Sequence, residues 1–152
     1  MHILADCRYE LPIAIAVTRG NFADVKKAKA LLRQGTFTDG RFRPKHVICD
    51  AAYSSYDLRR AIRNYGAKPI IDPNAQHKKA VALTIRDDAW KALMRQRTAI
   101  ERVNSRLKLH RRLDSVRVRG KAKVWLHAML SVVVLQAQAV ATESRVSVRR
   151  VA

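Results

Sequence analysis

The sequence predicts one mixed α/β domain in which helices cover the faces of a small sheet. Short apolar runs rich in β-branched residues alternate with amphipathic segments, in the order strand, strand, helix, strand, helix, strand and two helical regions. A chain of 152 residues with 48% hydrophobic side chains is long enough to enclose a core. These observations favour a single domain built around a mixed sheet.

The N-terminal third predicts a hairpin followed by a helix. Residues 2–6 and 11–18 are apolar runs joined by a short polar segment, which is typical of two antiparallel strands. Asp24 is placed to cap a helix that runs to about Gln34. The two glycines and basic residues of 35–44 then predict a loop.

The middle of the chain predicts two strands around a helix. Residues 47–49 form a continuously apolar run that Asp50 closes, as expected for a strand buried on both faces. Ser54 or Ser55 begins a helix that Gly66 ends. Residues 68–71 predict another short strand, and the polar, basic stretch 74–84 predicts a crossover.

The C-terminal half predicts helices. Residues 86–112 are helical in pattern, with one break near Arg95, and a long helix follows over 121–141. We expect residues 1–141 to form the domain and the basic residues 142–152 to form a frayed tail. The apolar segment 124–141 is short for a membrane span and contains four polar residues, so a buried or docking helix is the better interpretation.

The charge of the chain points to a polyanionic partner. Thirty-one Lys and Arg against 12 Asp and Glu give a net charge of +19. Cations that neutralise phosphates release condensed counterions, so nucleic acid is the default partner; a ribosomal or histone-like packing protein stays open. The first residues lack the pattern of a signal peptide, and we expect a cytoplasmic, nucleoid-associated protein. We expect Cys7 and Cys49 to be buried free thiols, and Trp90 and Trp125 to be core anchors.

Three charged residues are spaced to share one face of a helix. Glu101 follows Arg97 by four residues and precedes Lys108 by seven, and both intervals are close to whole helical turns. A neighbouring apolar stripe, Ile100, Val103 and Leu107, is placed to pack on the sheet. An ordinary surface helix with an Arg–Glu pair is the simpler alternative for this trio.

Asp50 gives the trio a possible site. An acid at the carboxyl end of a buried strand lies where ligand sites form in α/β sheets. Two carboxylates from separate elements suit Mg²⁺, a hard cation that prefers oxygen ligands. Paired ions of this kind assist phosphodiester cleavage. The alternative is that Asp50 only forms a turn after its strand.

Two segments resemble the boxes of one enzyme family. Residues 50–55, DAAYSS, resemble the D-x-x-Y-x-S box of bacterial insertion-sequence transposases of the DDE type. Residues 97–108, RTAIERVNSRLK, resemble the signature around the final glutamate of that family. The resemblance continues through residues 11–18, Gly20-Asn21 and Asp24 and into 119–122, so it covers nearly the whole chain.

The resemblance implies an RNase H-like fold and a metal-dependent reaction at DNA. It implies Asp50 and Glu101 as ligands of Mg²⁺ or Mn²⁺, two ions in a complete site, and cleavage and strand transfer at transposon ends. It implies double-stranded DNA, both transposon ends and target, as partner, and a homodimer when complete. The residues implied to contact DNA are Arg97, Lys108, Tyr53, Asn104 and Arg102.

The chain departs from the family pattern at two places. Met94 stands where the family commonly has a tyrosine. The family's first catalytic aspartate, which lies on a strand before the hairpin, has no counterpart here. Asp6 is better interpreted as a turn former than as a substitute for this acid. We therefore expect an RNase H-like sheet that lacks its central strand, and a chain that is inactive alone.

Three hypotheses follow from the sequence. The chain is an active part completed by other polypeptide, or a transposase remnant that still binds DNA, or an unrelated basic nucleic-acid-binding protein whose acids are structural.

Overall fold

A computed structural model describes residues 1–18, 24–38, 43–73 and 86–151. The first sheet is the predicted hairpin, in which β1 (His2–Ala5) pairs antiparallel with β2 (Pro12–Ala16). The second sheet is formed by β3 (His46–Cys49) and β4 (Lys68–Ile71), which pair in parallel. The described strands thus make two separate two-stranded sheets, where the sequence predicted one mixed sheet.

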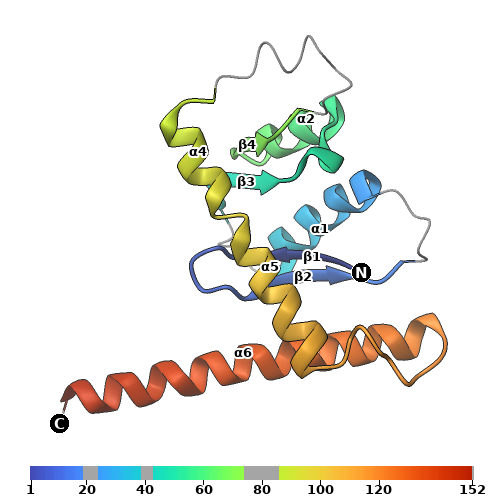
Figure 1. Ribbon diagram of the computed structural model, residues 1–152, viewed down its shortest axis with the longest axis vertical. Helices are drawn as coiled ribbons and strands as arrows, with labels where there is room; N and C mark the ends of the chain where they lie inside the picture. The colour runs from blue at the N-terminus through green and yellow to red at the C-terminus, as the bar shows by residue number, and fades with distance from the viewer. Residues whose placement is uncertain (19–23, 39–42, 74–85, 152) are drawn as a thin grey trace.

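Helices connect and cover these sheets (Figure 1). The first is α1 (Asp24–Thr38), which packs on β1 and β2 and also contacts α2 (Tyr56–Asn64). A short 3₁₀ turn, η1 (Ala51–Tyr53), links β3 to α2. The C-terminal half then contains α4 (Asp88–Arg95), α5 (Thr98–Ser105), the π-helical turn η2 (Arg106–His110) and the long α6 (Lys121–Val151).

Local sequence signals set several boundaries as predicted. Ser55 caps α2, because its hydroxyl oxygen accepts a hydrogen bond from the amide of Leu58 at 3.1 Å. Gly66 follows α2 with a φ of +76°, a left-handed conformation that favours glycine. The predicted break near Arg95 is confirmed, since α4 ends there and α5 starts at Thr98.

Four sequence-based expectations need correction. Helix α1 runs through Gly35 to Thr38, so the predicted loop begins later, while the predicted crossover over 74–84 lies outside the described residues. Helix α6 extends to Val151, through the segment expected to fray. Cys7 is exposed because it lies in the hairpin turn rather than in a strand. Trp125 is 45% exposed because it lies in the first turns of α6, where no residue of 121–127 is buried.

The hydrophobic core consists of two clusters, one for each sheet. The first joins the hairpin to the C-terminal helices through Ile15, Val103, Leu107, Ala128, Val132 and Leu135. The second surrounds β3 and β4 with Leu32, Val47, Leu58, Ile62, Ala67 and Ile71. The predicted apolar stripe of the Glu101 helix is confirmed, because Val103 and Leu107 are fully buried and Ile100 packs against the same cluster.

Helix α6 is only partly covered by the body. Its segment Lys121–Glu143 has a mean hydropathy of 1.6 and is long and apolar enough to cross a membrane by length and composition. One such helix is weak evidence, because a core helix of a soluble protein passes the same test. In this structure α6 packs against the hairpin and α5, as expected for a docking helix.

The burial of η2 gives a matched test of the core. Leu107 is fully buried and Leu109 is 68% exposed, although both lie in the same π-helical turn. We expect Leu107→Ala to lower the free energy of unfolding by about 2–5 kcal/mol, because it leaves a cavity. We expect Leu109→Ala to change it by less than about 0.5 kcal/mol. Urea denaturation followed by circular dichroism measures both, and equal losses would contradict the packing of η2.

Candidate functional site

Asp50 is positioned by the end of β3 and by a local turn. Its extended backbone (φ −77°, ψ 176°) ends the strand, and its side chain caps η1. One carboxylate oxygen, Oδ1, accepts a hydrogen bond from the amide of Ala52 at 3.0 Å. The side chain is exposed and fixed in direction, and Oδ2 lies outside that hydrogen bond. Asp50 therefore acts as a turn former, and this leaves an oxygen available to a ligand.

Glu101 lies on the exposed side of α5. The helix is fixed by Ala99 and Val103, which are buried on its opposite side. The Arg97 guanidinium lies 3.1 Å from Oε1 of Glu101, so the predicted Arg–Glu pair forms. Both side chains are well exposed, and such a pair contributes little to stability. Oε1 of Glu101 therefore already has a cationic partner.

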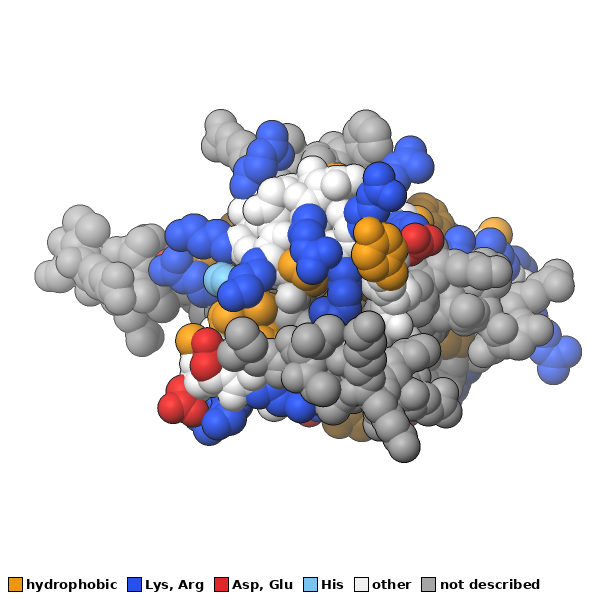
Figure 2. Space-filling view, turned by 90° about the horizontal axis from the view of Figure 1, so that it is seen from above, with side chains coloured by type: hydrophobic (Ala, Val, Ile, Leu, Met, Phe, Trp, Pro, Cys, Tyr) orange, Lys and Arg blue, Asp and Glu red, His pale blue; other side chains and the backbone are white. Residues whose placement is uncertain are grey.

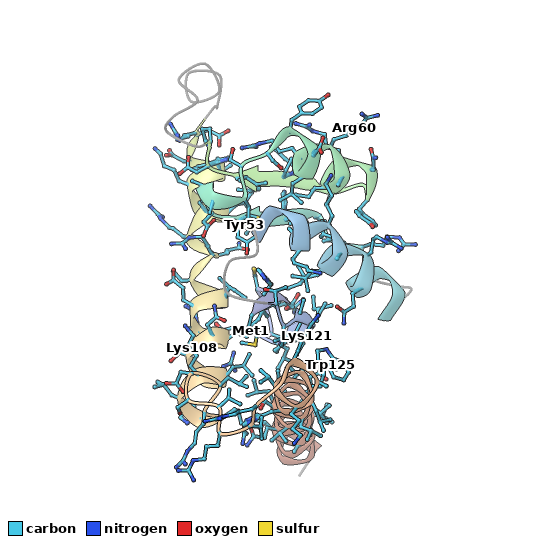
Figure 3. All side chains as sticks on the ribbon, turned by 90° about the vertical axis from the view of Figure 1, so that its right-hand side faces the viewer. Met1, Tyr53, Arg60, Lys108, Lys121 and Trp125 are labelled. Carbon is cyan, nitrogen blue, oxygen red and sulfur yellow. The ribbon has the colours of Figure 1, made fainter. Side chains whose placement is uncertain are left out.

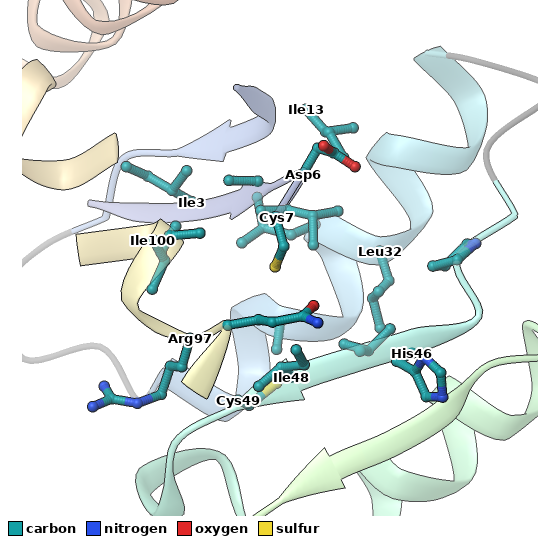
Figure 4. Close-up of a pocket in the computed structure, with 18 of the residues that line it drawn as sticks. Ile3, Asp6, Cys7, Ile13, Leu32, His46, Ile48, Cys49, Arg97 and Ile100 are labelled. Atoms are coloured by element: carbon teal, nitrogen blue, oxygen red, sulfur yellow. The ribbon is translucent and has the colours of Figure 1, made fainter. Parts of the chain in front are cut away.

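A cavity of about 740 Å³ lies between the two sheets (Figure 4). Strands β1 and β3 form two of its walls, and α1 and α5 contribute the others. The two predicted acids, Asp50 and Glu101, are 51 positions apart in the sequence, and both line this cavity. Asp6 lines it as well. The sulfur of Cys7 also points into it, whereas the Arg97 side chain points outward. The fold thus brings the two predicted acids to one cavity.

Asp6 behaves as the turn former that the sequence indicated. Its Oδ1 accepts hydrogen bonds from the amides of Arg8 and Tyr9, at 2.9 and 2.6 Å. Within residues 1–18, 24–38, 43–73 and 86–151, no three His, Cys, Asp or Glu side chains lie close enough together to hold a metal ion. Asp50 and Glu101 have the hard oxygen donors that Mg²⁺ takes. The donor chemistry therefore fits a divalent cation, and the number of donors falls short.

The other predicted DNA-contacting residues are divided by the structure. Tyr53 and Asn104 line the cavity beside the two acids. Lys108 is exposed on η2 (Figure 3) and is not among the residues that line the cavity. The turn from Arg106 onward is π-helical, which is wider than an α-helical turn, so Lys108 does not keep the face that regular α-helical spacing assigned to it.

Glu10 is a structural residue that sequence reasoning missed. It lies in the hairpin turn with a φ of +53°. Its Oε1 accepts a hydrogen bond from Nε of Arg102 at 2.6 Å, and its Oε2 lies 3.2 Å from Arg106. Arg106 also donates to the backbone carbonyl of Glu10. These contacts, which we call the Glu10 clamp, tie the hairpin to α5 and η2 and occupy Arg102.

The clamp and the cavity also shift proton affinities. The hydrogen bond from Arg102 lowers the pKa of the Glu10 carboxyl, and the charges of Arg102 and Arg106 act in the same direction. Burial raises the pKa of the Cys49 thiol to about 12, and the nearby charge of Asp50 adds to this shift. Cys49 therefore stays protonated and unreactive at neutral pH.

Basic side chains also gather away from the cavity. Figure 2, which looks down on the end of the molecule that carries β3, β4 and α2, shows many more blue than red side chains. Exposed Arg60 and Arg63 lie on α2, while Lys68 starts β4 beside His46. These two strand starts are at the opposite end of the sheet from Asp50. The excess positive charge is therefore not confined to the cavity.

Comparison with known proteins gives one finding. Residues 1–136 match the model of the family described as the transposase DDE domain. Searches of curated proteins and of solved structures each found no match.

The Glu10 clamp makes stability depend on pH. Because the native pKa of Glu10 is lowered, its contribution is fully present above the unfolded-state value of about 4.3 and is lost as the pH falls through the native value. We expect Glu10→Gln to lower the midpoint of thermal unfolding at neutral pH. The difference from the parent should shrink as the pH falls below about 4.

Thermal unfolding followed by circular dichroism at several pH values measures this effect. The control is Asp114→Asn, which removes one exposed negative charge from a residue outside the clamp. A difference between parent and Glu10→Gln that stays constant with pH would show that the clamp does not act through the carboxylate charge.

Proposed function

The chain belongs to the transposase DDE domain family, and we propose that it carries part of the catalytic centre that cleaves and joins phosphodiester bonds at transposon ends. The family supports DNA transposition in general and implies a DNA substrate. The observation that carries the finer proposal is that Asp50, after β3, and Glu101, on α5, line the same cavity.

We assign Asp50 and Glu101 as metal ligands. Members of the family generally use divalent metal ions, and these two carboxylates supply oxygen atoms of the kind that Mg²⁺ or Mn²⁺ takes. Two such ions activate the attacking oxygen and stabilise the departing one in phosphodiester cleavage. In the protein, the Asp50 carboxylate accepts a hydrogen bond from the Ala52 amide, and Glu101 pairs with Arg97.

The cavity supports an RNase H-like sheet with one strand missing. Strand β1 pairs only with β2, and β3 only with β4, among the strands that the structure describes. The free edges of β1 and β3 both line the cavity, and the two strands run in opposite directions (Figure 1). A strand inserted between them, parallel to β3 and antiparallel to β1, would satisfy both edges. We propose that such a strand carries the third acid.

The proposed DNA contacts lie around these acids. Lys108 is an exposed cation on η2, Arg97 is a partly exposed cation at the start of α5, and Tyr53 and Asn104 line the cavity. Arg102 has the least support, because Glu10 already binds its guanidinium. We propose double-stranded DNA as the partner and a homodimer as the complete form, acting in the cytoplasm at the nucleoid. Residues 1–141 would form the catalytic unit and 142–152 a basic extension.

A second function is favoured by the count of donors. Among the described residues, no group of three metal-ligating side chains is present. The net charge of +19 supports phosphate binding without any catalytic acid. A non-catalytic nucleic-acid-binding protein, including a transposase remnant, is therefore the alternative that the experiments must separate from the first proposal.

Cleavage of transposon-end DNA tests the metal ligands. The chain is fused to the segment encoded directly upstream of Met1 and assayed with Mg²⁺ or Mn²⁺. We expect the fusion to cut DNA and the chain alone to be inactive. Asp50→Asn keeps an oxygen for the Ala52 amide, so it removes charge with little change to the turn. We expect Asp50→Asn and Glu101→Gln to lose roughly 100-fold or more in rate, because even outer ligand contacts contribute 10–100-fold.

The matched control is Asp57→Asn, an exposed acid on α2 that pairs with Lys29 and does not line the cavity. We expect this variant to keep the parent rate. If Asp50→Asn and Glu101→Gln cut as fast as the parent, the metal assignment is wrong. If the fusion binds DNA without cutting it, the binding-protein alternative is favoured. Amide exchange along β1 and β3 should slow in the fusion if a strand fills the cavity.

Salt dependence tests the DNA contacts independently of cleavage. The logarithm of the binding constant should fall linearly with the logarithm of salt concentration for the isolated chain. We expect Arg97→Ala and Lys108→Ala each to reduce this slope by about 1, because each removes one phosphate contact. Lys68→Ala, at the opposite end of the β3–β4 sheet, serves as the control. Equal effects from all three variants would mean that binding is spread over the whole surface.

A further inference from the structure

Arg59 joins the turn after β3 to the end of β4. One of its guanidinium nitrogens, Nη2, donates a hydrogen bond to the backbone carbonyl of Ile71, the last residue of β4, at 2.9 Å. The same nitrogen lies 3.5 Å from Oγ of Ser54, at the outer limit of a hydrogen bond. Ser54 ends η1, the turn that Asp50 caps. A single side chain on α2 therefore contacts both segments.

The guanidinium of Arg59 is partly withdrawn from water at the carboxyl edge of the β3–β4 sheet. Burial lowers the pKa of Arg59, and the charge of Arg63 acts in the same direction. Cys49, at the end of β3, and Asp72, directly after β4, act on this pKa in the opposite direction. The side chain stays a cation at neutral pH. Influence from both strand ends places the guanidinium close to each of them.

The packing of α2 explains why Arg59 reaches this edge. Leu58 and Ile62 are fully buried and fix one side of the helix on the core cluster around β3 and β4. Arg59 follows Leu58 by one residue, about 100° around the helix, so it lies at the margin of the packed side. Helical side chains lean toward the N-terminal end of their helix, and Ser54 lies just before that end of α2. Arg60, one residue further, is exposed.

The turn that carries Asp50 is shaped by local hydrogen bonds. The amides of Tyr53 and Ser54 donate to the carbonyls of Asp50 and Ala51, at 3.1 and 3.0 Å. None of the residues of η1 is buried, although Tyr53 packs partly against the core cluster and α1 contacts the turn. Local bonds fix the shape of the turn but not its position relative to β4. The contacts of Arg59 supply that second attachment.

Two acids follow the parallel strands at this edge, and one of them lines the cavity. Cys49 is opposite Ile71 in the register, so Asp50 and Asp72 come next on neighbouring strands. Oδ1 of Asp72 accepts hydrogen bonds from Nε and Nη2 of Arg86, at 3.1 and 2.8 Å, and Asp72 is not among the residues that line the cavity. Asp50 lines the cavity, and its described partner is a backbone amide of its own turn. The direction of Asp50 therefore depends on where the turn is held.

We propose that Arg59 is a positioning residue for Asp50: it attaches the turn after β3 to β4 and so sets where the Asp50 carboxylate lies at the cavity. This inference rests on the proposed role of Asp50 as a metal ligand. Arg59 is not among the residues that line the cavity, so it acts through the turn. Groups that orient a metal ligand in this way contribute roughly 10–100-fold to metal affinity.

Manganese binding to the full chain tests this role. Paramagnetic Mn²⁺ broadens the NMR signals of amides close to it, and we expect it to broaden those of residues 50–54 in the parent. Arg59→Met keeps a long apolar side chain and removes the donors to Ile71 and Ser54. We expect this variant to need a roughly tenfold or more higher Mn²⁺ concentration for the same broadening.

Two variants on the same helix are matched controls. Arg60→Met makes the same chemical change one residue away, at an exposed side chain. Ile62→Val lowers the stability of the core without touching the carboxyl edge of the sheet. At a temperature where circular dichroism shows every variant folded, both controls should bind Mn²⁺ as the parent does. A purely structural role for Arg59 would make Arg59→Met and Ile62→Val behave alike.

Exchange of the Ala52 amide with water tests the turn without any metal. This amide donates to Oδ1 of Asp50, so it should exchange faster when the turn loses its attachment to β4. We expect Arg59→Met to speed this exchange and the two control variants to leave it unchanged. Ser54→Ala should speed it less than Arg59→Met, because the bond from Arg59 to the Ile71 carbonyl remains.

The two measurements separate this inference from the metal assignment. If Arg59→Met changes neither Ala52 exchange nor the Mn²⁺ concentration, or if Ile62→Val changes them as much, the positioning role is wrong. If Mn²⁺ broadens no signal near Asp50 in the parent, the metal assignment fails, and Ala52 exchange alone decides the role of Arg59. Faster exchange in Arg59→Met then supports the attachment of the turn, and unchanged exchange overturns it.

Discussion

The attachment of α5 to the hairpin is the contact on which the candidate site depends. Val103 and Leu107 are buried completely against the hairpin and α6, and the Glu10 clamp adds charged hydrogen bonds from Arg102 and Arg106 at the turn. A hydrophobic contact has no direction, whereas the hydrogen bonds of the clamp fix the position of α5 along the hairpin. Because α5 is fixed in this way, Glu101 lines the same cavity as β3 and Asp50, which follows β3.

The division of the core follows from the same geometry. Each two-stranded sheet buries its own apolar cluster, and α1 packs across both, because it contacts the hairpin and α2. A two-stranded sheet is marginal by itself and depends on the helices that cover it. The edges of β1 and β3 that pair with no described strand lie at the cavity between the clusters. The proposed acids are at the same place, so folding and chemistry would be completed by the same added strand.

Sequence reasoning succeeded where a signal is local and failed where it is distant. Ser55, Gly66 and the apolar run before Asp50 act within a few residues, and the structure confirms the elements they predicted. The Glu10–Arg102 contact joins residues 92 positions apart, and no periodicity reports it. Trp125 was expected in the core because its size suggests burial, but the size of a side chain does not show how far along α6 the body reaches, and no residue of 121–127 is buried. The positions of Asp50 and Glu101 were predicted, and their assignment as ligands stays a prediction.

The cations nearest the acids act first on the protein itself. Arg97 pairs with Glu101, and Arg102 and Arg106 bind Glu10, so three of the positive charges on the α5–η2 segment already have an anionic partner. The described partner of Asp50 is instead the backbone amide of Ala52, which carries no net charge. A divalent cation held by Glu101 would compete with Arg97 for that carboxylate, whereas the described contact of Asp50 is with a backbone amide.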